Sequence, residues 1–472
     1  MKRLLSVLLI FVMVLSFTAC GSKTTQNDET KTEPEQQASQ EETVDNQEVD
    51  NQETEEQLVS EEGEVLNIWT WNTEFWDFLC KYYADETIDE YTCKKGDVTI
   101  KRTTYPSEDL AYQNALDEAL LAQADAPEDE KVDIFLAEAD YIMKYTQSEA
   151  TMDVTTIGVD DFSNAYAYTV AAASDENGVP KGVSFQCCPS AMIYRRSIAK
   201  DVLGTDDPAE VQEFVSDWDK FDEVAAMAKE KDYYMLGTVD ATYRVFSNNV
   251  SSAWVEDGKL NFDEAINAWM DQAKTYMDKG YAHYAADIWS TEATSDMGKD
   301  GKALCYFGPA WYFQFSMGTA FDPETGSSGD WAICEGPQAH FWGGTWILAA
   351  NGTDNPTMVA DIMNTFIHDE EVCTKLVEEA GQFVNNKTIN DKFAADDSYG
   401  YDFLGGQNFV KVFAEMTDNI KFEHQTIYAQ ACNEKLQAYY RDFLNGQVTK
   451  EQAIANFKDE IKTMYPNVDV GE

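Results

Sequence analysis

Basic residues are scarce in this chain of 472 residues. Lysine and arginine number 34 against 86 aspartate and glutamate residues, which gives a formal net charge of −52. A surface this acidic repels phosphate and other anionic groups, so we expect neither nucleic acid nor an anionic substrate as a partner. The acidic residues are spread along the whole chain, a pattern more typical of solubility than of one specific site.

Recognisable catalytic and metal-binding motifs are also missing. The sequence has no GxSxG, HExxH or GxxxxGK[ST] pattern, and its four histidines are scattered. Its nine cysteines form no CxxC pair and no zinc-binding spacing. We therefore predict no enzyme activity, no cofactor and no metal. Disulfides such as Cys80 with Cys93, or Cys305 with Cys334, are left open by the sequence.

The apolar run at the N-terminus is too short to cross a bilayer. Lys2 and Arg3 precede apolar residues 4–17, whereas a membrane-spanning helix needs about 20. The run ends in Phe-Thr-Ala-Cys, which resembles the lipobox of bacterial lipoproteins. We predict a signal peptide over 1–19 and a lipid on Cys20, whose two acyl chains would suffice for stable anchoring. Residues 20–64 are polar and acidic, and are expected to form a disordered tether.

The remaining chain of roughly 400 residues exceeds one ordinary core and predicts two α/β domains. Apolar strands at 65–69, 98–102 and 132–136 alternate with helices, which indicates parallel β-α-β units. Ligands of such sheets bind beyond the carboxyl ends of the strands. Those ends carry Trp71, Asn72, Glu74, Tyr105, Glu138 and Asp140.

The stretch over 329–366 marks a turning point of the chain. A short strand ends at Gly336-Pro337, an aromatic loop follows, and a glycine pair opens a second strand that contains Trp346. Asp354 or Asn355 can cap the next helix, and Pro356 suits its first position. Trp346 is interpreted either as a ligand contact or as a core residue.

Five segments in the same order give the chain its resemblance to a known family. They are the strand at 133–135, SDWDKFDEVAAMAK, GKALCYFGPAW, the GGTW segment, and FLNGQVTKEQAIANF, in which Thr449 and Gln452 form a capping box. The chain resembles the extracellular solute-binding proteins of carbohydrate ABC importers, the family of maltose-binding protein. The resemblance implies a periplasmic-binding-protein-like (type II) fold of two lobes with three hinge crossings. We expect 65–180 with 340–390 in lobe 1, and 181–339 with 391–472 in lobe 2.

A sugar site needs flat aromatic faces and hydrogen-bonding side chains. Trp71, Trp254, Trp311 and Trp346 follow strand ends or turns and are candidates for the first role. The resemblance places Trp311 at a stacking position, Glu74 at a polar position, Asp140 at a carboxylate position and Tyr243 at an aromatic position. Gln186 and Asp240 are further candidates. Ala137 stands where several members have tryptophan, which argues against a maltose-like binding mode.

The resemblance implies that the protein captures a carbohydrate, expected to be an oligosaccharide, and delivers it to the permease and ATPase of an ABC transporter. We expect a monomer anchored to the outer face of the bacterial cytoplasmic membrane. Two alternatives remain at this point. A glycoside hydrolase would need two carboxylates across one bond, and the same fold could instead cage a polyamine-like cation between acidic and aromatic groups.

Overall fold

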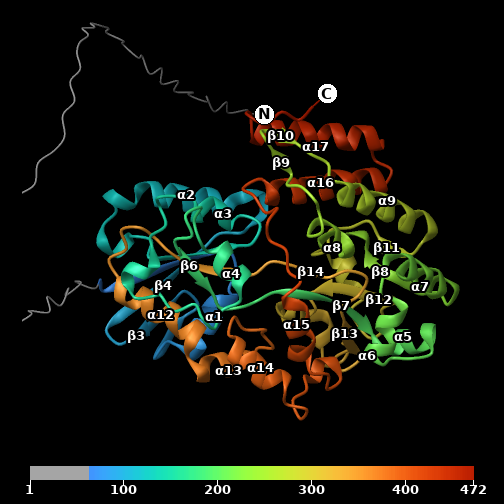
Figure 1. Ribbon diagram of the computed structural model, residues 1–472, viewed down its shortest axis with the longest axis horizontal. Coiled ribbons are helices and arrows are strands. Elements are labelled where there is room, and N and C mark those ends of the chain that lie inside the picture. The colour runs from blue at the N-terminus through green and yellow to red at the C-terminus, as the bar shows by residue number, and fades with distance from the viewer. Residues whose placement is uncertain (1–62, 472) are drawn as a thin grey trace, which may run out of the picture. The chain divides into compact units, whose positions relative to one another are not determined.

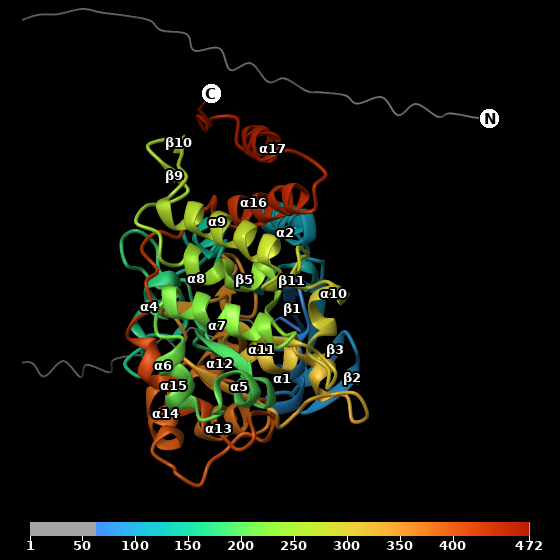
Figure 2. The ribbon, with the colours of Figure 1, turned by 90° about the vertical axis from the view of Figure 1, so that its right-hand side faces the viewer.

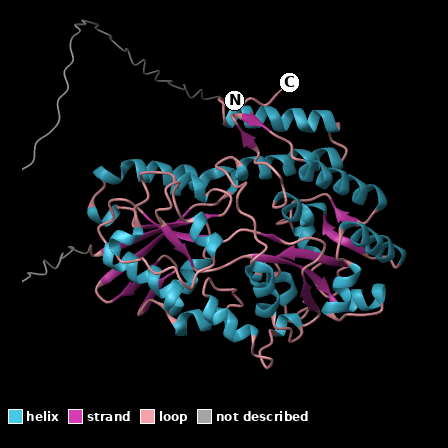
Figure 3. Cartoon of the chain, viewed as in Figure 1, coloured by secondary structure: helices cyan, strands magenta, loops and turns pink. Residues whose placement is uncertain are grey.

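The computed structural model describes residues 63–471, and the predicted signal peptide, Cys20 and most of the tether lie outside them. The described chain is a mixed α/β structure with two main sheets, each flanked by helices (Figures 1 and 3). No helix within residues 63–471 combines the length and apolar character that a membrane span requires.

The first sheet has seven strands in the order β2-β3-β4-β1-β5-β15-β6. Their bounds are β1 Val65–Thr70, β2 Glu86–Asp89, β3 Thr92–Lys95, β4 Val98–Thr104, β5 Ile134–Glu138, β6 Gly182–Ser184 and β15 Thr345–Ala349. β1 pairs in parallel with β4 and β5, as the alternating pattern predicted. β2 and β3 were not predicted, because β2 is fully exposed and both strands carry charged side chains rather than an apolar run.

The second sheet has the strand order β11-β8-β12-β7-β13, with β14 paired to β7. Its strands are β7 Pro189–Arg195, β8 Tyr234–Thr238, β11 Ala282–Tyr284, β12 Ala303–Gly308, β13 Trp331–Cys334 and β14 His340–Phe341, and a separate hairpin joins β9 Val255–Glu256 to β10 Lys259–Leu260. β6 therefore belongs to the first sheet and β14 to the second, so the chain passes between sheets a few residues from the predicted positions 180/181 and 339/340.

The helices cover the faces and ends of both sheets (Figure 1). Their bounds are α1 Glu74–Tyr82, α2 Ala111–Ala122, α3 Ile142–Thr146, α4 Ala167–Ala172, α5 Arg196–Leu203, α6 Pro208–Phe214, α7 Trp218–Glu230, α8 Tyr243–Ser247, α9 Glu264–Lys279, α10 Thr291–Ser295, α11 Ala310–Phe315, α12 Pro356–His368, α13 Glu370–Glu378, α14 Lys387–Ala394, α15 Phe409–Thr417, α16 Ala429–Leu444 and α17 Lys450–Met464. The predicted cap is confirmed at Thr449, whose side chain accepts from the Gln452 amide. Asn355 precedes Pro356 at the start of α12 but makes no side-chain cap.

Three segments connect the two sheets and pair with one another. The Cys187 amide donates to the Phe383 carbonyl at 2.8 Å, and the Asn385 amide donates to the Phe185 carbonyl at 3.0 Å. The Trp342 amide donates to the Cys188 carbonyl at 3.2 Å. Because buried backbone groups need partners, these bonds fix the three crossings side by side.

The described cysteines, from Cys80 onward, carry free thiols. Cys305 and Cys334 lie on β12 and β13, which pair with opposite edges of β7. Two strand spacings separate them, about 9–10 Å, which exceeds the reach of a disulfide. The Cys305–Cys334 alternative is therefore wrong for this fold. Cys80 and Cys93 are hydrogen-bonded neighbours but are not bridged.

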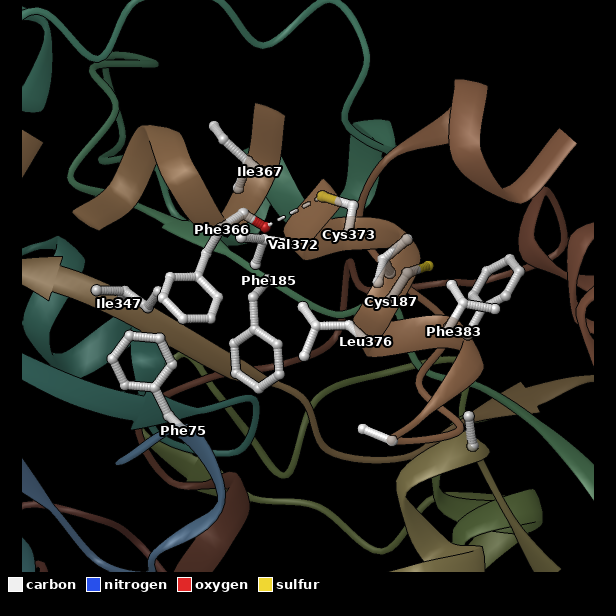
Figure 4. Close-up of a cluster of buried hydrophobic side chains, with 14 of the residues drawn as sticks. Phe75, Phe185, Cys187, Ile347, Phe366, Ile367, Val372, Cys373, Leu376 and Phe383 are labelled. Carbon is white, nitrogen blue, oxygen red and sulfur yellow. Dashed lines mark hydrogen bonds between the residues drawn. The ribbon is translucent and has the colours of Figure 1, made fainter. Parts of the chain in front are cut away.

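Aromatic packing beside the crossings builds the core of the first lobe. Phe75 of α1 lies 4.9 Å from Phe366 of α12 and 5.6 Å from Phe185 of the first crossing, between ring centroids. The three rings point toward one another, next to Ile347 of β15 (Figure 4). This contact joins the start of α1, and with it Glu74, to the crossing segments.

We predict that Phe75→Ala lowers the free energy of unfolding by about 3–5 kcal/mol, because it removes a fully buried ring and leaves a cavity. Urea unfolding followed by circular dichroism measures the change. Leu121→Ala, on the exposed side of α2, is the control and should shift it by less than about 0.5 kcal/mol. Equal effects of the two substitutions would contradict the assignment of Phe75 to the core.

Candidate functional site

The carboxyl ends of β1 and β5 bring polar side chains to one edge of the first sheet. β1 is followed by Trp71 and Asn72, and Glu74 begins α1. The Asn72 Oδ1 accepts from the Glu74 amide at 3.1 Å, which fixes this turn. β5 ends at Glu138, followed by Asp140. Because β1 and β5 are parallel neighbours, the predicted edge is present.

Glu74 connects α1 to two of the crossings. Its Oε2 accepts from Gln186 Nε2 and its Oε1 from Gln382 Nε2, each at 3.1 Å. Burial raises the pKa of Glu74 to about 7, and the two amide donors lower it. Gln186 in turn accepts from the Cys188 thiol at 3.1 Å. Of the predicted polar candidates, Glu74 and Gln186 are therefore in direct contact.

Asp140 and Arg244 form a bidentate ion pair that joins the lobes. Arg244 lies on α8, which follows the second sheet, and its Nη1 and Nη2 donate to Asp140 Oδ1 and Oδ2 at 2.9 and 2.6 Å. The guanidinium carbon lies 5.6 Å from the Trp342 ring centroid. Paired hydrogen bonds of this kind are strong and directional. Asp140 is thus occupied by Arg244, a partner that sequence reasoning did not identify.

Glu138 lies between this ion pair and Trp311. Its Oε2 accepts from the Asp140 amide at 2.8 Å. Gly343 has a φ of +66°, which favours glycine, and a Cβ there would lie 3.3 Å from both Glu138 Oε1 and the Trp311 ring, a tight contact. Burial and the Asp140 charge raise the pKa of Glu138 to about 8, and Arg244 lowers it.

Trp311 presents a half-buried indole at the place where the two lobes meet, which we call the junction. Its Nε1 donates to the Trp342 carbonyl at 3.3 Å, and the two rings lie edge to face with centroids 5.2 Å apart. Trp289 stacks nearly parallel to Trp311 at 6.4 Å. Trp71 lies at the β1 edge, with its ring 5.9 Å from Tyr141. Trp71, Trp311, Glu74, Glu138, Asp140 and Gln186 thus belong to one junction of both lobes.

Four predicted tryptophan and tyrosine candidates lie elsewhere. Trp346 is 1% exposed, and its Nε1 donates to the Thr169 carbonyl, so it is a core residue. Tyr243 and Trp254 are buried and both donate to Asn433 Oδ1. Tyr105 is exposed and stacks on Trp69 at the surface. None of the four therefore presents a free aromatic face beside Trp311, and a ligand contact at these residues stays a prediction.

Asp240 also has a structural partner rather than a free carboxylate. It is buried and forms an ion pair with Arg441 of α16, which also contacts Asp287 at 2.9 Å. Burial raises the pKa of Asp240 to about 7 despite the attraction of Arg441. Asp240 thus anchors Arg441, and its predicted ligand contact stays a prediction.

Sequence reasoning missed Trp289, Trp342, Arg244 and Gln382. Trp342 lay in the recognised aromatic loop, and Arg244 lay four residues after Asp240, so both could have been considered. Trp289 and Gln382 follow no strand pattern, and only the fold brings them to the junction.

Two hollows in the described chain lie away from this junction. One of them has a volume of only about 20 Å³, room for about one water molecule, and is lined by residues of α8, α9 and α16 and the loops beside them, among them Trp254, Asp263 and Asn433. Asp263 already accepts from Ser251, Ser252 and Ala265, and so offers little to a ligand. Within residues 63–471 no three histidine, cysteine or acidic side chains are grouped as metal ligands would be.

We predict that Glu138 makes the unfolding free energy fall as the pH rises from 5 to 8. Its folded pKa of about 8 exceeds the ordinary value of 4.5, so its stabilising contribution is complete below 4.5 and is lost as the pH rises through 8. Glu138→Gln stays neutral and should remove part of this fall, on the order of 1–3 kcal/mol. Denaturant titrations at pH 5, 6.5 and 8 measure it.

Glu379→Gln is the matched control, because Glu379 is exposed and its pKa lies below 4.5, outside the tested window. The control should retain the pH dependence of the parent protein. An unchanged pH dependence in Glu138→Gln would show that the Glu138 carboxylate is solvated.

Solved structures share this fold along most of the chain. An extracellular solute-binding protein of family 1 matches with a TM-score of 0.67 and 18% identity over 85% of this chain and 99% of its own. An ABC-transporter-associated binding protein from B. animalis subsp. lactis Bl-04, solved with β-1,6-galactobiose, matches with a TM-score of 0.65 and 15% identity over 87% and 100%. A galacto-N-biose/lacto-N-biose I-binding protein from Bifidobacterium longum, solved with lacto-N-biose, gives 0.62 and 14% over 87% and 100%.

A comparison with curated protein sequences gives no significant match. The profile of the bacterial extracellular solute-binding proteins matches residues 86–400, two thirds of the sequence. This is a family of binding proteins rather than enzymes, so the hydrolase alternative is set aside. The two sheets, the three crossings and the profile match agree: the chain belongs to the bacterial extracellular solute-binding protein family.

Proposed function

We propose that this protein captures an oligosaccharide at the junction of its two lobes and delivers it to the permease of an ABC importer. The observation that carries the proposal is the half-buried indole of Trp311, placed beside the Glu138 carboxylate where residues of both lobes meet. An indole face suits the C–H face of a pyranose, and a carboxylate accepts from its hydroxyl groups.

Amide and carboxyl groups around Trp311 supply the remaining chemistry that a sugar needs. Gln186, Gln382 and Glu74 form a connected polar group, and Trp71 adds a second aromatic face at the β1 edge. Similar structures hold β-1,6-galactobiose and lacto-N-biose, which supports a neutral glycan as the ligand class.

The Asp140–Arg244 pair supports closure of the lobes around a ligand. Each partner comes from a different lobe, and both are largely buried. The bidentate hydrogen bonds of this pair form only when the lobes meet, and separation of the lobes exchanges them for bonds to water. A closed state of this kind is what a permease must distinguish from the open one.

A polyamine-like cation is the second candidate, because Glu74, Glu138 and Glu434 all lie near the junction. Burial raises the pKa of each of the three, so the site carries less negative charge at neutral pH than three free carboxylates would. The charge of Arg244 is balanced by its ion-pair partner Asp140, so this pair adds no net charge to the site. These features favour a neutral ligand over a cation.

Trp311→Ala should weaken binding of the best glycan at least about tenfold, because it removes the stacking face of the site. Isothermal calorimetry against galacto-, malto-, xylo- and cello-oligosaccharides, with spermidine as a separate arm, measures the change. We expect the melting temperature of the unliganded protein to move by only a few degrees.

Trp218→Ala is the matched control, since Trp218 is also half-buried and stacks on Phe246 at 4.3 Å, away from the junction. It should leave affinity unchanged. Tight spermidine binding with no response to any glycan would overturn the proposal, and unchanged glycan affinity in Trp311→Ala would assign this ring to packing.

We also propose that residues 1–19 are removed as a signal peptide and that the lipidated Cys20 anchors the chain through the tether 20–64. The short apolar run and the Phe-Thr-Ala-Cys sequence support this. Cys20→Ser should move the protein from the membrane fraction to the culture medium while leaving glycan affinity intact. Fractionation and immunoblotting test it, and retention at the membrane would argue for a different anchor.

A further inference from the structure

Four aromatic side chains form a continuous group that we call the aromatic platform: Trp289, Trp311, Phe315 and Trp342. Trp289 lies 5.6 Å from Trp342 and 6.1 Å from Phe315, and Trp311 lies 6.3 Å from Phe315, between ring centroids. They come from the loop before α10, from α11 and from the segment after β14, and α10 and α11 are labelled in Figure 2.

Exposure increases along the platform from the junction outward. Trp342 is 8% exposed and Trp311 is half-buried, whereas Trp289 is 52% and Phe315 is 55% exposed. Large aromatic rings that remain this exposed next to a binding site commonly mark a contact surface. The outer half of the platform has no role in packing the core that would account for it.

The backbone of Trp289 is fixed by a hydrogen bond, and its indole packs against the three other rings of the platform. Its amide donates to Asp287 Oδ1 at 3.0 Å, and the other oxygen of Asp287 contacts Arg441 of α16 at 2.9 Å. Arg441 is fixed in turn by the buried Asp240. A ring positioned in advance loses little entropy when a ligand binds, which favours affinity.

We propose that Trp289 and Phe315 form an outer subsite that stacks the sugar units projecting beyond the unit held at Trp311. This inference rests on the proposed function and narrows the ligand to a glycan longer than a disaccharide. The planes of Trp289 and Trp311 differ by only 21° and their centroids lie 6.4 Å apart, so the exposed ring of Trp289 continues the aromatic surface of Trp311 outward. The hydroxyl groups of the outer units stay in water and need no polar side chains there.

The test compares chain lengths within one linkage series. Dissociation constants are measured by calorimetry for the di- and tetrasaccharide of whichever of the galacto-, malto-, xylo- or cello-series binds the parent protein. Trp289→Ala and Phe315→Ala should each weaken tetrasaccharide binding about tenfold and disaccharide binding less than twofold. Trp311→Ala should weaken both. Tyr91→Ala, an equally exposed aromatic that packs on Arg102, is the control and should change neither.

Acrylamide quenching gives a second measurement. The difference in quenching between the parent protein and Trp289→Ala reports on the Trp289 indole. This difference should shrink when the tetrasaccharide binds, and it should stay unchanged when the disaccharide binds. Unchanged tetrasaccharide affinity in both Trp289→Ala and Phe315→Ala overturns the outer subsite and leaves the proposed function standing. If these variants keep affinity but lose uptake in cells, the platform contacts the permease instead. If no glycan binds the parent protein, both proposals fail.

Discussion

The three segments that cross between the sheets must satisfy their backbone groups without the help of a sheet on either side. They do so by pairing with one another, through the Cys187–Phe383, Asn385–Phe185 and Trp342–Cys188 bonds. A strand that left this group would bury unpaired amides. The crossings therefore hold backbone of both lobes together, and the polar and aromatic candidates gather beside them.

The side chains of the junction inherit their positions from this constraint. Gln186 and Gln382 lie on two crossings, and both donate to Glu74. On the remaining crossing, the carbonyl of Trp342 accepts a hydrogen bond from the indole of Trp311. A ligand at this point would contact groups that move together when the lobes rotate. The proposed binding and closure would then be coupled through short distances between neighbouring side chains.

Much of the fold could be predicted from the sequence, because alternating strands and helices, Pro356 and the Thr449 cap depend on local chemistry. The edge formed by Trp71, Glu74, Glu138 and Asp140 followed from the rule for parallel strands. The remainder depended on tertiary structure. Trp346 and Trp311 are both tryptophans in short apolar contexts, yet one donates to a buried carbonyl in the core and the other stays half-exposed. The Asp140–Arg244 pair joins residues 104 apart, a separation at which no sequence pattern operates.

The loop that carries Trp289 lies outside both sheets, and its Asp287 contacts Arg441 of α16. Loops of this kind tolerate substitution without loss of the fold. Selection can therefore change the outer aromatic residues at low cost in stability, while Glu74, Gln186 and the crossings remain constrained. In evolutionary terms, an outer subsite at Trp289 would let the preferred ligand length diverge between descendants of this protein faster than the site proposed at Trp311.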